Sequence, residues 1–291
     1  MKENNNRLGW LFASPYLIYS LVFFLIPLVW SFYLSFTNWD LIAPEYDFVG
    51  FDNFAKALKS PGVHAAFWVT YKFMMVFVPL VVVLSLVVSI LVHSLPRLKS
   101  LFLIGFFLPY LSSGVVSALI VKGLLSYNSP VNTALRKIGI NIDWLGTSWS
   151  ALLIVGMIMA WKFTGYYALI LTSGLESIDH EVYEAAAIDG VTGRQRFWKI
   201  TLPLLYPALY TTLILAFGVT FGIFTEVYQL TGGGPNNATN TWQMEIYSQA
   251  FKNLQAGYAS AVALLASVAT FISIFIIRKL LEKWGARNGW V

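Results

Sequence analysis

Residues Phe73 to Leu95 read FMMVFVPLVVVLSLVVSILVHSL, a run without a single aspartate, glutamate, lysine or arginine. About 20 consecutive apolar residues are enough for a helix to cross the roughly 30 Å hydrocarbon core of a bilayer. Inside that core a helix satisfies its own backbone hydrogen bonds, which an isolated strand cannot do. This run therefore predicts a membrane-spanning helix.

Five further runs of similar length and apolar character occur along the chain, at about 9–36, 101–125, 149–174, 204–230 and 257–277. The first is far longer than the apolar part of a cleavable signal peptide, and we expect it to be a retained helix. Together the six runs predict an all-α, polytopic membrane protein with a single transmembrane domain over residues 1–291 and six transmembrane helices.

The composition supports this class and excludes several others. The chain of 291 residues is 57% apolar and only 11% charged, its mean hydropathy is +0.67, and an ordinary soluble domain has about 25% charged residues. The net charge of +5 comes from scattered Lys and Arg, not from the clustered basic face that nucleic-acid binding requires. With no cysteine, and with His64, His93 and His180 far apart, we expect no metal site.

The distribution of Lys and Arg between the connecting segments predicts the orientation, because cytoplasmic loops are enriched in these residues. One alternating set comprises the N-terminus, the turn at 95–100, the loop at 175–203 and the C-terminal tail. It holds Lys2, Arg7, Arg97, Lys99, Arg194, Arg196, Lys199, Arg278, Lys279, Lys283 and Arg287. The other set is longer in total and holds only Lys56, Lys59, Lys72, Lys122, Arg136, Lys137 and Lys252. We therefore expect both termini in the cytoplasm (N-in/C-in).

Two of the outward segments have readable patterns. Between Asp40 and Ser60, four apolar residues share one helical face, which predicts a short helix on the membrane surface or an ordinary amphipathic connector. The segment from Thr231 to Thr241 begins with Gly232-Gly233-Gly234-Pro235 and continues with Asn and Thr. It is either a loop rich in hydrogen-bonding groups or simply a flexible one.

The inward segment 175–203 is much longer than a simple turn and reads as two short helices. We expect the first to begin near Asp179, with acidic residues at the positive end of its dipole, and to end at Gly190 in the left-handed conformation. We expect the second to start after Thr192 and to end as Pro203 approaches the next span. Its middle, Glu184 to Gly190, is rich in alanine, which suits either docking onto another protein or packing against the chain's own helices.

The same segment carries a pattern of the form E-A-A-x-x-x-G, nine residues, then I-x-L-P. Its members are Glu184, Ala185, Ala186, Gly190, Ile200, Leu202 and Pro203. This pattern resembles the signature loop of ABC importer permeases, in which a coupling helix inserts into the cytoplasmic ATPase subunit. Three more segments resemble the carbohydrate-uptake, maltose-type branch, and in particular the first permease of a heterodimeric pair: 49–54, 108–110 and 230–235.

The resemblance implies the partners and cofactors of the chain. They are a second, related permease subunit, two copies of an ABC ATPase, an extracytoplasmic solute-binding protein and the lipid of a bacterial cell membrane. None of the 21 glycines is followed by lysine, so the chain has no P-loop. We therefore expect no cofactor on this chain, ATP and Mg being bound by the partner ATPase, and no catalytic residues.

Two groups of residues are predicted to border the substrate pathway. Similarity to maltose-type permeases, position by position, implies Tyr110, Gly114, Tyr166, Thr220 and Ile223. Lys162 and Glu226 are added because charges within membrane spans are costly and usually line a cavity or meet a partner. A direct pair between these two residues requires a break in one helix, and interface contacts or snorkelling to water would also account for them.

The resemblance to the maltose-type branch implies an importer of a sugar or oligosaccharide. A lysine within the fourth span would also suit an anionic solute such as glycerol 3-phosphate, and that alternative stays open. A secondary transporter predicts ion-coupling residues or pore rings and has no need of a docking loop. A membrane enzyme would require paired carboxylates, a histidine cluster or an activated nucleophile, and the sequence has none of these patterns.

Overall fold

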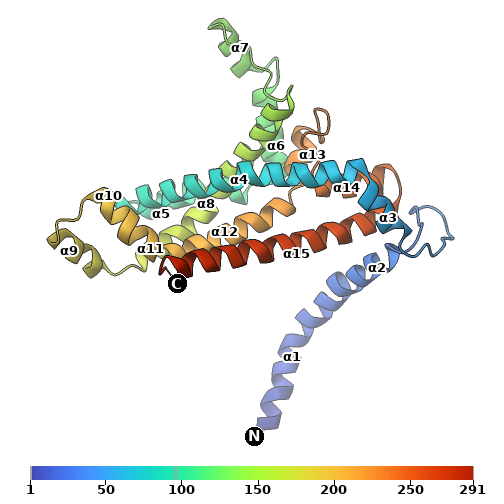
Figure 1. The fold of residues 1–291 in the computed structure, drawn as a ribbon, viewed down its shortest axis with the longest axis horizontal. Coiled ribbons are helices and arrows are strands. Elements are labelled where there is room, and N and C mark those ends of the chain that lie inside the picture. The colour runs from blue at the N-terminus through green and yellow to red at the C-terminus, as the bar shows by residue number, and fades with distance from the viewer. Residues whose placement is uncertain (1, 96, 291) are drawn as a thin grey trace. The chain divides into compact units, whose positions relative to one another are not determined.

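The computed structural model describes residues 2–95 and 97–290, and within them the regular structure is helical (Figure 1). The one strand-like contact among them is an isolated antiparallel bridge between Thr37 and Phe48. The side chains of Lys2 and Arg7, which the orientation prediction counts, lie outside what the structure describes. The chain divides into two compact units, one with the residues up to His64 and Glu245–Val268, the other with Ala65–Met244 and the residues from Ala269.

The first unit begins with a long apolar helix. Helices α1 (Lys2–Ser20) and α2 (Ile26–Leu34) are joined by one π-helical segment, Leu21–Leu25, so the run continues without a turn. Residues Leu8–Leu34 are long and apolar enough to cross a membrane. Only a small part of this run is buried within the chain, so its side chains are free to face lipid or another protein.

The short helix predicted between the first two spans is present as α3, Asp52–Lys59. Its buried Asn53 donates two hydrogen bonds from Nδ2, at 3.0 Å to the carbonyl of Ser35 and at 2.7 Å to that of Thr37. Both carbonyls lie just beyond the end of α2, where helical partners are missing. Asn53 therefore fixes α3 to the end of the first span.

The second span is a longer helix than the sequence predicted. Helix α4 runs over Pro61–Ser94, whereas the apolar run that predicted it starts at Phe73. Pro61 is favourable in a first turn because its missing N–H has no helical partner there. Hydropathy detects the charge-free part of a helix only, so the turns before Lys72 were missed.

The third predicted span, 101–125, is not one straight helix. Helix α5 (Lys99–Leu111) and helix α6 (Gly114–Leu125) are separated at Ser112 and Ser113, both with extended backbone. The chain bends by 92° between Lys99–Leu111 and Gly114–Lys137. Pro109 in the last turn of α5 weakens the helix there. The Ser112 hydroxyl contacts the Pro109 carbonyl at 2.6 Å and the Ser117 hydroxyl at 2.6 Å, which satisfies polar groups exposed by the break.

The fourth span agrees with its prediction. Helix α8 covers Ser148–Glu176 and begins with a capping box between Thr147 and Ser150. It packs closely on α5, because a Cβ atom at Gly165 would overlap the backbone of Phe106. Phe73 and Phe77 of α4 are fully buried in the same core. Helix α8 is thus the buried centre of the second unit.

The fifth predicted span, 204–230, is also interrupted. Helix α12 (Tyr206–Phe221) ends at Gly222, and helix α13 (Thr225–Leu230) follows after Phe224. Before them, α11 (Leu202–Leu204) closes the loop region, and the chain bends by 67° between Gly193–Leu204 and Tyr206–Phe221. Gly222 favours such a break because glycine is a poor helix former.

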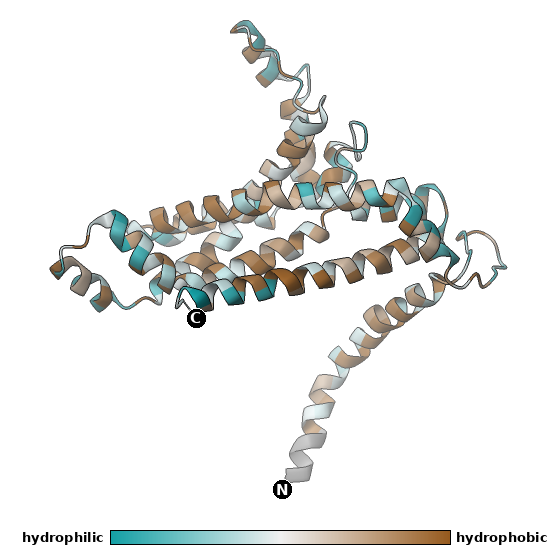
Figure 2. Ribbon diagram, viewed as in Figure 1, coloured by the Kyte–Doolittle hydropathy of each residue, from teal (hydrophilic) through white to brown (hydrophobic). Residues whose placement is uncertain are grey.

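The remaining elements complete the chain. They are α7 (Pro130–Lys137), α9 (His180–Ile188), α10 (Gly193–Arg196), a π-helical segment at Phe197–Thr201, α14 (Trp242–Tyr247), a second such segment at Ser248–Lys252, and α15 (Ala256–Arg287). Figure 2 shows long apolar stretches on α4 and α15, with hydrophilic residues at the C-terminal end of α15. Among the described residues four helices are long and apolar enough to cross a membrane, or up to six if each bent pair is one span.

Candidate functional site

The loop between α8 and α12 is folded as the sequence predicted. Asp179 accepts a hydrogen bond from the Glu181 N–H at 3.1 Å and caps α9. Gly190 has φ +71°, and the N–H groups of Gly190 and Val191 return to the carbonyls of Ala187 and Ala186. This Schellman arrangement requires the left-handed backbone that glycine adopts without strain. The sharp end of α9 is therefore a property of Gly190.

The second half of this loop starts with another cap. Thr192 and Gln195 form a capping box at the start of α10. The Tyr183 hydroxyl donates to Thr201 Oγ1 at 3.3 Å, so the two halves of the loop contact each other. The loop is consequently an ordered helical hairpin, and we call residues Leu175 to Pro203 the docking loop.

The seven residues of the signature pattern differ in their exposure. Glu184, Ala185 and Gly190 are exposed, whereas Ala186 and Leu202 are buried. Ile200 and Pro203 are intermediate. Beside the exposed residues, Ile188 is 87% exposed. The loop thus presents small and apolar side chains outward on a framework held by Ala186 and Leu202, and such a patch is suited to a protein contact.

Lys162 and Glu226 form a buried ion pair. Lys162 Nζ of α8 lies 2.7 Å from Glu226 Oε1 of α13. The two residues are 9% and 6% exposed. From the sequence, a direct pair requires a break in one helix. The structure has that break at Gly222 to Phe224. Removing one member of such a pair costs about 3–5 kcal/mol, because the other charge stays buried without its partner.

Gly114 lies directly against the ion pair. A Cβ atom at this position would be 2.6 Å from Glu226 Oε1 and 3.2 Å from Lys162 Nζ. Gly114 is the first residue of α6 after the break at Ser112 and Ser113. Three predicted residues from three helices, Gly114, Lys162 and Glu226, are therefore brought together.

The two predicted tyrosines also meet. The rings of Tyr110 and Tyr166 are stacked with centroids 4.7 Å apart and 14° between their planes, and Phe163 meets Tyr110 edge to face at 5.3 Å. Tyr110 is in the last turn of α5 and Tyr166 in α8, and both are partly buried. Tyr166 lies one helical turn after Lys162, so the aromatic pair and the ion pair occupy adjoining levels of α8.

Thr220 and Ile223 are buried in the core instead of lining an open surface. The Thr220 hydroxyl is hydrogen-bonded at 3.0 Å to the carbonyl of Ala216 in its own helix. The Ile223 side chain belongs to the main hydrophobic cluster, and its carbonyl accepts a hydrogen bond from Thr241 Oγ1 at 3.1 Å. Thr220 thus lies at the end of α12 and Ile223 within the break between α12 and α13.

Thr241 and Gln243 were missed as contributors to this region. Gln243 Nε2 donates to the Phe221 carbonyl at 3.4 Å, and Thr241 Oγ1 donates to the Ile223 carbonyl. Both side chains therefore satisfy carbonyls left free by the helix break. The Asn- and Thr-rich composition of 231–241 was the only signal for them. Their partners lie about 20 residues earlier in the chain, which composition cannot reveal.

An apolar cavity of about 530 Å³ lies between α4, α5 and α8. Its lining includes Phe102, Phe106 and Trp161 but none of the predicted pathway residues. No group of three potential metal ligands from His, Asp and Glu occurs in the described part of the chain.

The fold and these features define a class: a polytopic helical membrane protein with an ordered loop between two spans and a buried ion pair near the middle of its helical core. The family model described as "Binding-protein-dependent transport system inner membrane component" matches residues 54–285. The chain belongs to this family, and its resemblance to ABC importer permeases is confirmed. It is therefore a membrane component of a binding-protein-dependent transport system.

Individual relatives cover nearly the whole chain. The multiple sugar-binding transport system permease protein MsmF of Streptococcus mutans is 32% identical, over 97% of this chain and 98% of its own length. The sn-glycerol-3-phosphate transport system permease protein UgpA of Rhizobium meliloti is 31% identical, over 90% of each chain. A bacterial alginate ABC transporter, solved with an alginate pentasaccharide-bound periplasmic protein, has a chain with the same fold: TM-score 0.84, 19% identity, 97% and 96% covered.

Proposed function

We propose that this chain is one permease subunit of an ATP-driven importer that moves a sugar or oligosaccharide into the cytoplasm of a bacterium. A solute-binding protein delivers the sugar, a second permease completes the pathway, and two ATPase subunits bind ATP and Mg. The chain lies in the plasma membrane with six spans, of which the third and the fifth are each interrupted by a helix break, and with both termini in the cytoplasm. Residues 1–291 act as a single permease domain.

The observation that carries the proposal is the structure of the docking loop. Its exposed Glu184, Ala185 and Ile188 stand on a framework capped by Asp179 and Gly190. The loop joins the C-terminal end of α8 to the N-terminal end of α12. A force applied to the loop by a closing ATPase therefore acts on the two helices that lead to Lys162 and to the break before Glu226.

Charge favours a neutral solute over an anionic one. An unpaired Lys162 would attract a phosphate, but its charge is compensated by Glu226 at 2.7 Å. An incoming anion would have to displace that carboxylate or share the site with it, and like charges at such range repel strongly at low dielectric. Sugars instead require aromatic rings and hydrogen-bonding groups, and Tyr110 and Tyr166 each carry a ring and a hydroxyl.

The proposed pathway is bordered by Tyr110, Gly114, Lys162, Tyr166 and Glu226. Thr220 and Ile223 belong to it only in a conformation in which the break between α12 and α13 opens. Such an opening is expected of a transporter that alternates between inward and outward access, because broken helices supply the polar groups and the freedom of movement.

The coupling role is tested by two glycines of the same loop. Neither Gly190 nor Gly193 has another atom within 4 Å of an added Cβ, but only Gly190 has a positive φ. Alanine costs about 1–2 kcal/mol in the left-handed region. We expect Gly190→Ala to reduce binding-protein-stimulated ATP hydrolysis of the reconstituted transporter, and Gly193→Ala to leave it unchanged. Glu184→Lys should abolish stimulation while the chain still inserts into the membrane.

Equal stimulation in the wild type, Gly190→Ala and Glu184→Lys would show that the loop does not couple. The solute class is tested in the same preparation, with the binding protein loaded either with neutral oligosaccharides or with glycerol 3-phosphate. Stimulation by glycerol 3-phosphate alone would replace the sugar proposal by the anionic alternative.

A further inference from the structure

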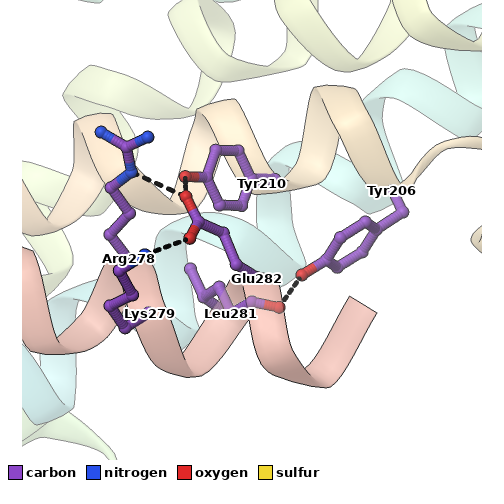
Figure 3. A network of polar contacts seen from close by, with 6 residues as sticks. All are labelled: Tyr206, Tyr210, Arg278, Lys279, Leu281 and Glu282. Atoms are coloured by element: carbon purple, nitrogen blue, oxygen red, sulfur yellow. Dashed lines mark hydrogen bonds and ion pairs between the residues drawn. The ribbon is translucent and has the colours of Figure 1, made fainter. Parts of the chain in front are cut away.

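Tyr206 links the end of the docking loop to the C-terminal end of α15. It is the first residue of α12 and follows Pro203 by one helical turn. Its side chain is buried, and its hydroxyl donates a hydrogen bond of 2.6 Å to the carbonyl of Leu281 (Figure 3). This buried hydroxyl loses its hydrogen bond to the Leu281 carbonyl if the two helices separate.

Tyr210 makes a second contact one turn further along α12. Its hydroxyl lies 3.4 Å from Glu282 Oε1, and the same carboxylate accepts from Arg278 Nε at 2.7 Å and from Lys279 Nζ at 3.4 Å (Figure 3). These charged side chains are exposed, and exposed ion pairs contribute little to stability. The buried contact of Tyr206 is therefore the stronger part of the link.

Trp290, near the C-terminus, also packs against the ring of Tyr206. Helix α15 ends at Arg287, Gly289 has φ +66°, and the Trp290 N–H returns to the Gly285 carbonyl at 2.9 Å. This Schellman arrangement folds Trp290 back onto the helix, with its ring 4.6 Å from that of Trp284 and 5.7 Å from that of Tyr206. Trp284 also contacts Tyr206 at 5.5 Å. The Tyr206 ring therefore packs with two tryptophans of the chain end that also accepts its hydrogen bond.

We propose that Tyr206 and Trp290 are positioning residues that make the docking loop and the C-terminal end of α15 move as one body. The inference rests on the proposed coupling role of the loop and adds a route for the movement. ATPase closure displaces the loop, and the aromatic contact passes that displacement to the last span as well as to α8 and α12. Without the contact, the loop would move while α15 stayed behind.

This chain has no cysteine, so in a transporter whose partner subunits also carry none, spin labels attach only at introduced sites. Glu181→Cys in α9 and Lys283→Cys in α15 are exposed positions outside the aromatic contact. We expect the label-to-label distance in the assembled transporter to be the same without nucleotide and with ATP and vanadate. In Trp290→Ala and in Tyr206→Ala we expect it to shift between these states by at least about 2 Å, the scale of helix shifts in switching proteins.

Two controls distinguish the positioning role of Tyr206 and Trp290 from the coupling role of the docking loop. Trp290→Phe should restore the constant distance, and co-purification with the ATPase shows whether each variant assembles. A variant that assembles and keeps a constant distance would overturn the positioning role. If the Glu181→Cys label shows no change in mobility when the ATPase binds, the docking role itself is wrong. If the wild-type distance changes with nucleotide, the loop and α15 do not form one body.

Discussion

At the scale of single residues, the ion pair depends on the absence of a side chain at Gly114. An alanine there would place its Cβ 2.6 Å from Glu226 Oε1. Glutamate is flexible and can move away, but the atom that must move is the one that contacts Lys162 Nζ at 2.7 Å. The added methyl group is small, but its effect on the ion pair is large because both charges are buried.

We expect Gly114→Ala to destabilise the chain by about 1–3 kcal/mol, although alanine is intrinsically the better helix former. Gly123→Ala is the matched control, because Gly123 is in the same helix and has no atom within 4 Å of an added Cβ. Thermal unfolding of the purified protein in detergent measures the difference. A melting temperature of Gly114→Ala equal to that of Gly123→Ala would contradict the close approach to the ion pair.

At the scale of elements, the two breaks decide what the helices can bring together. The third span is interrupted after Pro109 and the fifth at Gly222 to Phe224. Each break exposes backbone groups that a continuous helix would satisfy, and nearby or distant side chains then bond to them. Ser112 acts locally at the first break, and Thr241 acts from a distant segment at the second.

We expect Thr241→Val to destabilise the chain by about 1–2 kcal/mol, because the buried carbonyl of Ile223 loses its donor. Thr211→Val is the control: its exposed hydroxyl bonds to the Pro207 carbonyl within its own helix, so little should change. Hydrogen exchange at α12 and α13 measures the effect locally. Equal protection in both variants would show that Thr241 does not hold the break.

At the scale of the whole molecule, the proposed orientation places the docking loop and the segment after α13 on opposite sides of the membrane. Single cysteines can be introduced into a chain that has none. We expect a membrane-impermeant maleimide added to intact spheroplasts to label Asn237→Cys but not Asp189→Cys, both of which are exposed positions. Asp189→Cys should react after permeabilisation. Labelling of Asp189→Cys in intact spheroplasts would reverse the orientation derived from Lys and Arg.

Much of the architecture follows from local properties of the chain. The apolar runs predicted the helices, and the fourth span was placed within one or two residues because Thr147 and Ser150 cap it and charge-free sequence fills it. The docking loop was predicted in detail since Asp179, Gly190 and Thr192 act on their immediate neighbours. Hydropathy missed the first turns of α4 and both breaks, because it averages over the residues that interrupt a helix.

The sequence by itself determined the class of protein, the helical segments, the caps of the docking loop and the presence of two charges within spans. Only the tertiary structure decided that these charges neutralise each other, that Gly114 lies against them, that Tyr110 stacks on Tyr166, and that Tyr206 packs with Trp284 and Trp290. The physical reason is the distance along the chain over which each interaction acts. Hydropathy, capping and glycine conformation act over a few residues, whereas an ion pair or a ring contact depends on how distant helices pack and where they break.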